Sequence, residues 1–293
     1  MPTNSKTISV NGRQYKLSEF LPEMTSLADM LAKNAHLTPE TALPPDTDFS
    51  DVDHQEVYAQ IGALGVLPRE ALDIFSSVFA AAHLPNLAAA LRRLSAVTQP
   101  RAMTATMHIF SLIPDPKHQP YLRKFLRNTD ASKGLGNIIA DGLIRGLTWG
   151  APAGFDAHCT LIIHTLFWCD PTGDDGKASI DAEIRDKLAK VLDDILARED
   201  VQAIPRVKRV DIERLRGLLD PVEAMPAAHF LDSTRQHLEG QVDMCAGDSL
   251  ERMCDEEPAL VCSRCKVVKY CGAACQNWHW KHGHKAHCHP TNY

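Results

Sequence analysis

The residues with the clearest chemistry are cysteines and histidines gathered near the C-terminus. Seven of the nine cysteines lie between Cys245 and Cys288, and five of the fourteen histidines lie between His279 and His289. Thiolate and imidazole are donors that zinc prefers. In a reducing compartment, clustered cysteines indicate a metal site more often than disulfide bonds. The C-terminal part of the chain is therefore predicted to bind metal.

Eight of these donors follow one pattern of spacings, C-x8-C-x7-C-x2-C-x5-C-x3-C-x8-H-x3-C. They are Cys245, Cys254, Cys262, Cys265, Cys271, Cys275, His284 and Cys288. A tetrahedral zinc ion takes four such donors, so eight donors suit two ions and leave no open coordination position for catalysis. A segment of about forty residues buries too little apolar surface to fold alone, so two structural zinc ions would supply its folding free energy.

Residues 262–288 read CSRCKVVKYCGAACQNWHWKHGHKAHC and closely resemble the MYND-type zinc finger. The residues that match this family are Tyr270-Cys271, Cys275-Gln276, Trp280, His284-Lys285 and Cys288, after a closely spaced cysteine pair. The resemblance implies that ligand pairs alternate between the two ions. The first zinc would be held by Cys245, Cys254, Cys271 and Cys275, and the second by Cys262, Cys265, His284 and Cys288.

One spacing departs from the family pattern. The first two cysteines of a MYND finger are usually only a few residues apart, whereas eight residues separate Cys245 from Cys254. Either a longer loop intervenes, or another residue completes the first site, and His237 is the nearest substitute. A RING or other cross-braced finger would also use eight ligands, but the residues around Tyr270 favour the MYND pattern. His282 and His287 are rival ligands by proximity, but they stand out of register with the family pattern, and we expect both, like His279 and His289, to be solvated on a helix.

The family resemblance also implies a function in protein–protein recognition, often of short proline-containing peptides in a shallow groove. By position, the residues that would face such a groove are Lys269, Tyr270, Gln276 and Trp280. Gln276 would hydrogen-bond to the peptide backbone, and the rings of Tyr270 and Trp280 would pack on apolar side chains or proline. An alternative for Trp280 is core packing between the metal sites.

The elements that precede this segment are predicted to be helices. Residues 1–17 contain Asn11-Gly12 and indicate a small hairpin or an irregular arm. Residues 18–240 show helical periodicity, with an apolar helix after Pro68 that Pro85 breaks or kinks. Residues 155–169 are apolar almost all round and predict a central buried helix. We therefore expect a mainly α chain, in which a multi-helix domain (18–240), an irregular bundle or helical-repeat-like stack, precedes a zinc finger at 245–288.

A second group of possible ligands lies within the apolar segment 155–169. These residues are His158, Cys159, His164 and Cys169. Cys159 and His164 are five positions apart and share no helical face well. We expect all four residues to pack in the core and to bind no metal.

The composition narrows the class of protein. Hydrophobic residues make up 44% and charged residues 23% of the 293 residues, as in a soluble globular protein. No apolar run reaches the roughly 18 residues that cross a bilayer, and the polar N-terminus lacks a secretory signal. The sequence thus indicates an intracellular protein, nuclear or cytoplasmic, without a membrane partner. The net charge of −6 argues against nucleic acid as a partner.

These observations favour an adaptor or regulatory protein whose finger binds a protein or peptide. The sequence contains no P-loop, GxGxxG, GxSxG or HExxH motif, and no Asn-His-x-Cys motif of a SET methyltransferase. We therefore expect no enzymatic activity. Two alternatives stay open: a nucleic-acid-associated transcriptional regulator, and an enzyme with an unrecognised active site in the helical domain.

Overall fold

The computed structural model describes residues 7–10, 13–16, 19–150, 154–224, 229–248 and 253–293. Near the N-terminus, strands β1 (Thr7–Val10) and β2 (Arg13–Lys16) pair antiparallel. Of the two forms expected for the N-terminal segment, a small hairpin and an irregular arm, the structure shows the hairpin. Its expected turn, Asn11-Gly12, lies outside the described residues.

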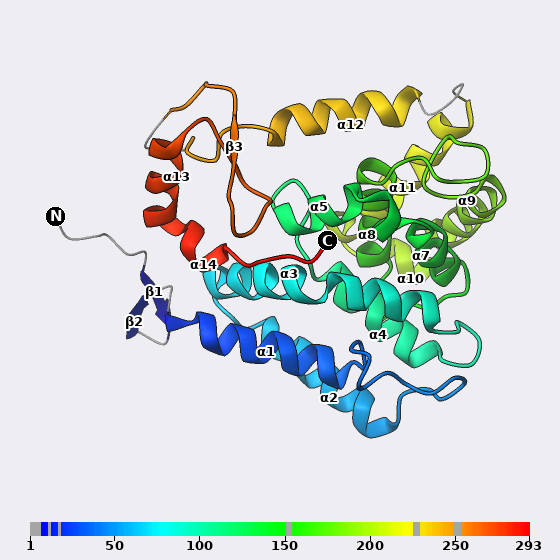
Figure 1. Cartoon of the computed structure of the whole chain (residues 1–293). Coiled ribbons are helices and arrows are strands. Elements are labelled where there is room, and N and C mark those ends of the chain that lie inside the picture. Colours follow the sequence, from blue (N-terminus) through cyan, green and yellow to red (C-terminus); the bar gives the residue numbers. More distant parts are fainter. Residues whose placement is uncertain (1–6, 11–12, 17–18, 151–153, 225–228, 249–252) are drawn as a thin grey trace.

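The rest of the described chain is mainly helical, as the sequence predicts (Figure 1). The helices before the finger are α1 (Leu21–Asn34), α2 (Asp51–Leu64), α3 (Arg69–Arg93), α4 (Pro100–Ser111), α5 (Pro120–Arg127), α6 (Thr129–Ser132), α7 (Leu135–Ile144), α8 (Phe155–Trp168), α9 (Ala182–Ala197), α10 (Glu199–Gln202), α11 (Arg206–Ala224) and α12 (His229–Val242). The finger contains β3 (Leu260–Val261), β4 (Lys269–Tyr270), α13 (Ala273–His279), a π-helical turn (Trp280–His284) and α14 (Lys285–His287).

Helix α3 lies at the centre of the first half of the molecule. It packs against α1, α4, α5 and α7, and also against α14 of the finger. The chain stays helical through Pro85, where the sequence predicted a break or kink. Pro85 cannot donate its backbone hydrogen bond, but the burial of Leu84, Leu87 and Ala88 around it stabilises the continuous helix.

The sequence predicted no apolar run long enough to cross a bilayer, and α3 changes that expectation. Within the described residues, α3 is the one helix that is long and apolar enough to cross a membrane. However, 78% of its apolar window is buried inside the protein, because neighbouring helices cover it. Its apolar character is therefore accounted for by packing in the core.

Helix α8 is the second central element, and it confirms the predicted buried helix. It packs against α4, α7, α11 and α12, and its apolar side chains are buried on all sides. Cys159 and Cys169 are part of this core, and burial raises the pKa of both thiols, to about 12 for Cys169. Both side chains are therefore neutral packing residues, as expected from their apolar surroundings.

The finger is attached to this helical scaffold at both of its ends. Helix α12 leads into it, and the residues after α14 run back between α3 and α5 (Figure 1). In this returning segment, the Tyr293 hydroxyl donates to the Ala80 carbonyl of α3 at 2.9 Å. The Tyr293 ring also meets Phe125 of α5 edge-on, with 5.3 Å between centroids.

Candidate metal centres

The first cluster of donors consists of four cysteines. It joins Cys245, Cys254, Cys271 and Cys275, whose sulfur atoms all lie within 4.8 Å of one another. The separations from Cys254 are 3.6 Å to Cys271 and 3.8 Å to Cys275, and Cys271 lies 3.3 Å from Cys275. Cys254 and Cys271 are partly exposed, whereas the other two are buried.

The second cluster consists of three cysteines and one histidine, all buried. It joins Cys262, Cys265, His284 and Cys288. The sulfur atoms of Cys262 and Cys288 are 3.7 Å apart. The Nε2 atom of His284 lies 3.4 Å from Cys262 Sγ and 3.7 Å from Cys265 Sγ. These two sets are the interleaved sets that the sequence resemblance implied.

Both donor sets fit a tetrahedral zinc ion. Sulfur atoms about 2.3 Å from a common zinc would stand about 3.8 Å apart, close to the observed separations. A disulfide would require about 2.05 Å, and all nine cysteines are free. Burial lowers the pKa of His284 to about 4, which keeps the imidazole in its neutral, metal-binding form at pH 7. The clusters are therefore consistent with two zinc ions.

Backbone hydrogen bonds also favour the metal-binding thiolate form of one cysteine in the first cluster. Burial opposes ionisation of Cys245, but backbone N–H groups of Cys271 and Gly247 donate to its sulfur and lower its pKa to about 7. A thiolate is the form of cysteine that binds metal. Zinc, when bound, would tie the separate loops together, and these donors would hold it without an open coordination position.

Described residues on the two sides of the wide gap between Cys245 and Cys254 bond to each other. The Asp248 carboxylate accepts a hydrogen bond from the Cys254 backbone N–H at 2.8 Å, and the Asp248 N–H donates to the Cys245 carbonyl at 2.9 Å. Gly247 packs so closely that an added Cβ would lie 2.5 Å from the Cβ of Cys275. Asp248 and Gly247 thus support the first centre, and the sequence analysis missed both.

Local elements place the remaining donors. Cys262 and Cys265 lie within the turn between β3 and β4, where the Cys262 N–H donates to the Val268 carbonyl at 2.9 Å. Cys275 lies in the first turn of α13. Gly283, with φ of 146°, bends the π-helical turn immediately before His284. That φ lies in a region that only glycine adopts without strain.

The candidate substitute and rival ligands lie outside both clusters. His237 is on α12, where its Nε2 atom lies 2.8 Å from the side-chain nitrogen of Gln241. His282 stacks on Trp278 and contacts its carbonyl at 2.6 Å. His287 reaches Ser77 of α3 at 3.2 Å. The first centre therefore needs no histidine.

One of the four residues expected to face a partner is buried. The Tyr270 side chain is 0% exposed, and its hydroxyl lies 3.1 Å from Nδ1 of His279. Its ring lies edge-on to the imidazoles of His279 and His284, with 5.8 Å and 6.2 Å between the ring centroids. The expectation that Tyr270 packs on a ligand is wrong, because its ring is enclosed inside the finger beside His279 and His284.

The other three residues lie nearer the surface. Lys269 is partly exposed, and its Nζ atom lies 3.0 Å from an Asp243 carboxylate oxygen. Gln276 on α13 is partly exposed. Trp280 is also partly exposed and packs against the core, with its ring edge-on to His284 at 5.9 Å.

A set of contacts that no sequence motif indicates attaches the second centre to the helical scaffold. The buried Tyr121 hydroxyl of α5 donates to the His287 carbonyl at 2.7 Å and accepts from the His289 N–H at 2.7 Å. The Lys124 ammonium donates to Thr291 at 2.7 Å. These partners are more than 160 residues apart, so local spacing contains no signal for them.

The profile of the MYND finger family matches residues 252–288. The chain contains a MYND finger. The matched region begins after Cys245, which the structure nevertheless brings into the first cluster. No solved structure matches the chain.

The chain is also similar to parts of three curated proteins of Arabidopsis thaliana. Ubiquitin carboxyl-terminal hydrolase 16 is 58% identical over 31 residues, 11% of this chain and 3% of that protein. Ubiquitin carboxyl-terminal hydrolase 19 is 47% identical over 47 residues, 16% of this chain and 7% of that protein. Ubiquitin carboxyl-terminal hydrolase 17 is 50% identical over 32 residues, which are 11% of this chain and 4% of that protein. The chain thus spans less than a tenth of each relative, and the likeness is that of a short shared segment.

Proposed function

We propose that this chain is a non-catalytic intracellular adaptor, nuclear or cytoplasmic, whose MYND finger binds a protein partner. Each donor set supplies four ligands, so a bound zinc would have no open position at which to activate water or substrate. A zinc ion with four protein ligands stabilises the fold of the finger and, with it, the surface that the finger presents. The short likeness to ubiquitin hydrolases supplies no catalytic region to this chain.

The observation that best supports this proposal is the apolar surface of the finger. Among the described residues, four of the eleven exposed large hydrophobic side chains are in or next to the finger: Met244, Met253, Leu260 and Val261. Leu260 and Val261 form strand β3 and are 44% and 49% exposed. Exposed apolar side chains on so small a domain are candidate contacts for a protein partner. Partly exposed Gln276 and Trp280 are candidates for the same contact, and a proline-containing peptide is one ligand that such a surface could bind.

Affinity capture with matched surface variants would test the proposal. The double substitution Leu260→Glu with Val261→Glu should remove the captured partners, while zinc content stays at two ions per chain. The control is Val207→Glu with Val210→Glu, which introduces the same charges at exposed apolar positions of α11. Identical partners for the β3 variant and the wild type would contradict the proposal.

A further inference from the structure

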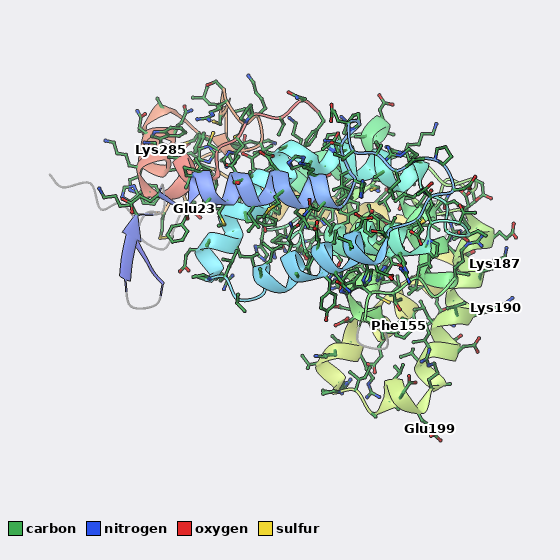
Figure 2. The ribbon with its side chains drawn as sticks, turned by 90° about the horizontal axis from the view of Figure 1, so that it is seen from below. Glu23, Phe155, Lys187, Lys190, Glu199 and Lys285 are labelled. Atoms are coloured by element: carbon green, nitrogen blue, oxygen red, sulfur yellow. The ribbon has the colours of Figure 1, made fainter. Side chains whose placement is uncertain are left out.

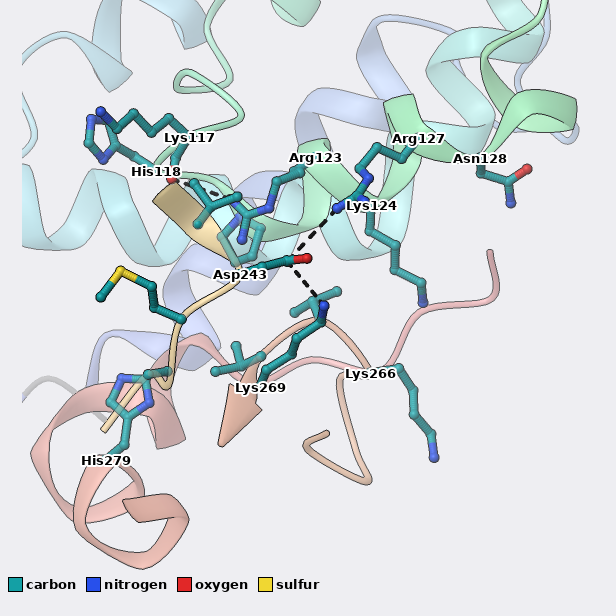
Figure 3. Close-up of a pocket in the computed structure, with 16 residues that line it drawn as sticks. Lys117, His118, Arg123, Lys124, Arg127, Asn128, Asp243, Lys266, Lys269 and His279 are labelled. Atoms are coloured by element: carbon teal, nitrogen blue, oxygen red, sulfur yellow. Dashed lines mark hydrogen bonds and ion pairs between the residues drawn. The ribbon is translucent and has the colours of Figure 1, made fainter. Parts of the chain in front are cut away.

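A cleft separates α5 from the β3–β4 hairpin of the finger (Figure 3). Its volume is about 670 Å³. One wall comes from α5 and the end of α12, and the other comes from residues 266–269 of the finger. Helix α5 does not belong to residues 252–288, which match the MYND finger family. The cleft therefore exists only where the finger packs on the helices that precede it.

The lining of this cleft is strongly basic. Six lysine and arginine side chains line it: Lys117, Arg123, Lys124, Arg127, Lys266 and Lys269. Among the described lining residues, Asp243 is the one carboxylate. The chain as a whole has a net charge of −6, so this concentration of positive charge is local. A concave surface of one charge sign focuses its field and attracts ligands of opposite charge.

The carboxylates near the cleft are already shared between cations. Asp243 lies 3.0 Å from the Lys269 ammonium and 3.9 Å from the Arg127 guanidinium (Figure 3). Glu239 of α12 lies 3.0 Å from Arg127. These two carboxylates therefore compensate Arg127 and Lys269, and the Asp243 charge also attracts the Arg123 guanidinium without forming an ion pair with it.

The other four cations form no ion pair within the described part of the chain. Lys124 donates to the neutral Thr291 hydroxyl, and Arg123 donates to the backbone carbonyl of Pro116 at 2.6 Å. Lys117 and Lys266 are exposed at opposite walls of the cleft. Neutral acceptors position a charge without cancelling it, so the cleft keeps an excess of positive charge.

We propose that this cleft binds an acidic peptide segment of a protein partner. The proposal rests on the adaptor function and names the chemistry of the partner. Apolar residues, among them Val242, Met244 and Val267, lie between the cations and suit aliphatic side chains between carboxylates. The volume suits a few side chains of an extended peptide. A long polyanion such as nucleic acid would also meet the negative remainder of the molecule.

Fluorescence anisotropy with the full zinc-loaded chain would test this assignment. The probe is a fluorescein-labelled peptide of about a dozen residues, with Asp or Glu at most positions and Leu at the others. We expect saturable binding that weakens as salt is added, because the attraction is between exposed charges. The same peptide with Asn and Gln in place of the acids should not bind.

The test variant is Lys117→Glu with Lys266→Glu, because both side chains are exposed and form no described ion pair. We expect it to weaken peptide binding by about ten-fold or more, since charge reversal replaces attraction with repulsion. The control is Lys187→Glu with Lys190→Glu on α9, which makes the same change of charge at the opposite end of the molecule from Lys285 (Figure 2). The control should bind the peptide within about two-fold of wild type.

Three results would overturn the proposal. They are no binding at low salt, equal loss in the test and control variants, and tighter binding of a single-stranded oligonucleotide of equal charge. Unchanged peptide affinity of the test variant would overturn it as well, and a lower unfolding temperature would then assign the cations to charge balance beside the zinc–thiolate sites. If the peptide fails to bind but the β3 variant still loses its partners, the cleft proposal alone falls and the adaptor function stands.

Discussion

The first metal centre is made by loops and α13 within the finger, whereas the second is built into the contact between the finger and the helical scaffold. Two of the four donors in the first centre are partly exposed, and all four donors in the second are buried. Cys288 of the second centre lies between His287 and His289, whose backbone groups bond to Tyr121 of α5. The second centre therefore couples metal binding to docking, and the first centre shapes the outer part of the finger.

Removal of both metals should have the largest effect. Structural zinc contributes about 10 kcal/mol or more to the folding of a small finger, so chelation should unfold residues 245–288. The helical scaffold has its own buried core and should keep most of its far-ultraviolet circular dichroism. Metal analysis before chelation should find two zinc ions per chain. A single zinc, or a scaffold that unfolds completely with the finger, would contradict the comparison.

Loss of one ligand should distinguish the two centres. Cys265→Ser and Cys254→Ser should each leave one zinc per chain. Cys265→Ser should lower the unfolding temperature more, because it leaves a buried site incomplete and loosens the returning C-terminal segment. Zinc content and thermal unfolding would measure both effects. Cys159→Ala, in the helical core, should retain both ions, and a larger effect at Cys254 than at Cys265 would reverse the assignment.

A smaller effect is expected from the link between α5 and the finger. Tyr121→Phe removes a hydroxyl that bonds to both the His287 carbonyl and the His289 N–H in a partly buried contact. We expect the free energy of unfolding to fall by about 3 kcal/mol in denaturant titrations. Tyr58→Phe is the control, since Tyr58 is largely exposed. Equal stability of the two variants would show that this contact does not hold the finger.

The smallest effect should come from the bend before His284. Gly283→Ala places a side chain at φ of 146°, and we expect a cost of about 1–2 kcal/mol with weaker retention of the second zinc. No atom lies within 4 Å of an added Cβ, so the cost comes from the backbone alone. Gly272→Ala is the control because its φ of −172° is ordinary extended backbone. Competition with a chromogenic chelator would compare zinc retention in the two variants.

Several features could be predicted because their causes are local. Donor type and spacing predicted eight zinc ligands, and the resemblance to the MYND finger predicted how they divide into two sets. The apolar segment 155–169 predicted α8, because a helix that is apolar on all sides must be buried. The burial of Tyr270 and the role of Asp248 could not be predicted in this way. The first depends on the packing of Tyr270 against His279 and His284, and the second on the bond between Asp248 and the Cys254 N–H, and residue spacing encodes neither.

By itself, the sequence predicted a mainly helical chain with eight zinc donors near its C-terminus, and its resemblance to the MYND finger divided these donors into two interleaved sets. Metal coordination and helical periodicity act over a few residues, so they are visible in one dimension. Only the tertiary structure decided that the second centre docks on α3 and α5 through Ser77, Tyr121 and Tyr293. It also decided that cations from α5 and the finger meet in one cleft. Those contacts join residues that are distant in the chain, and each depends on the packing of the whole molecule.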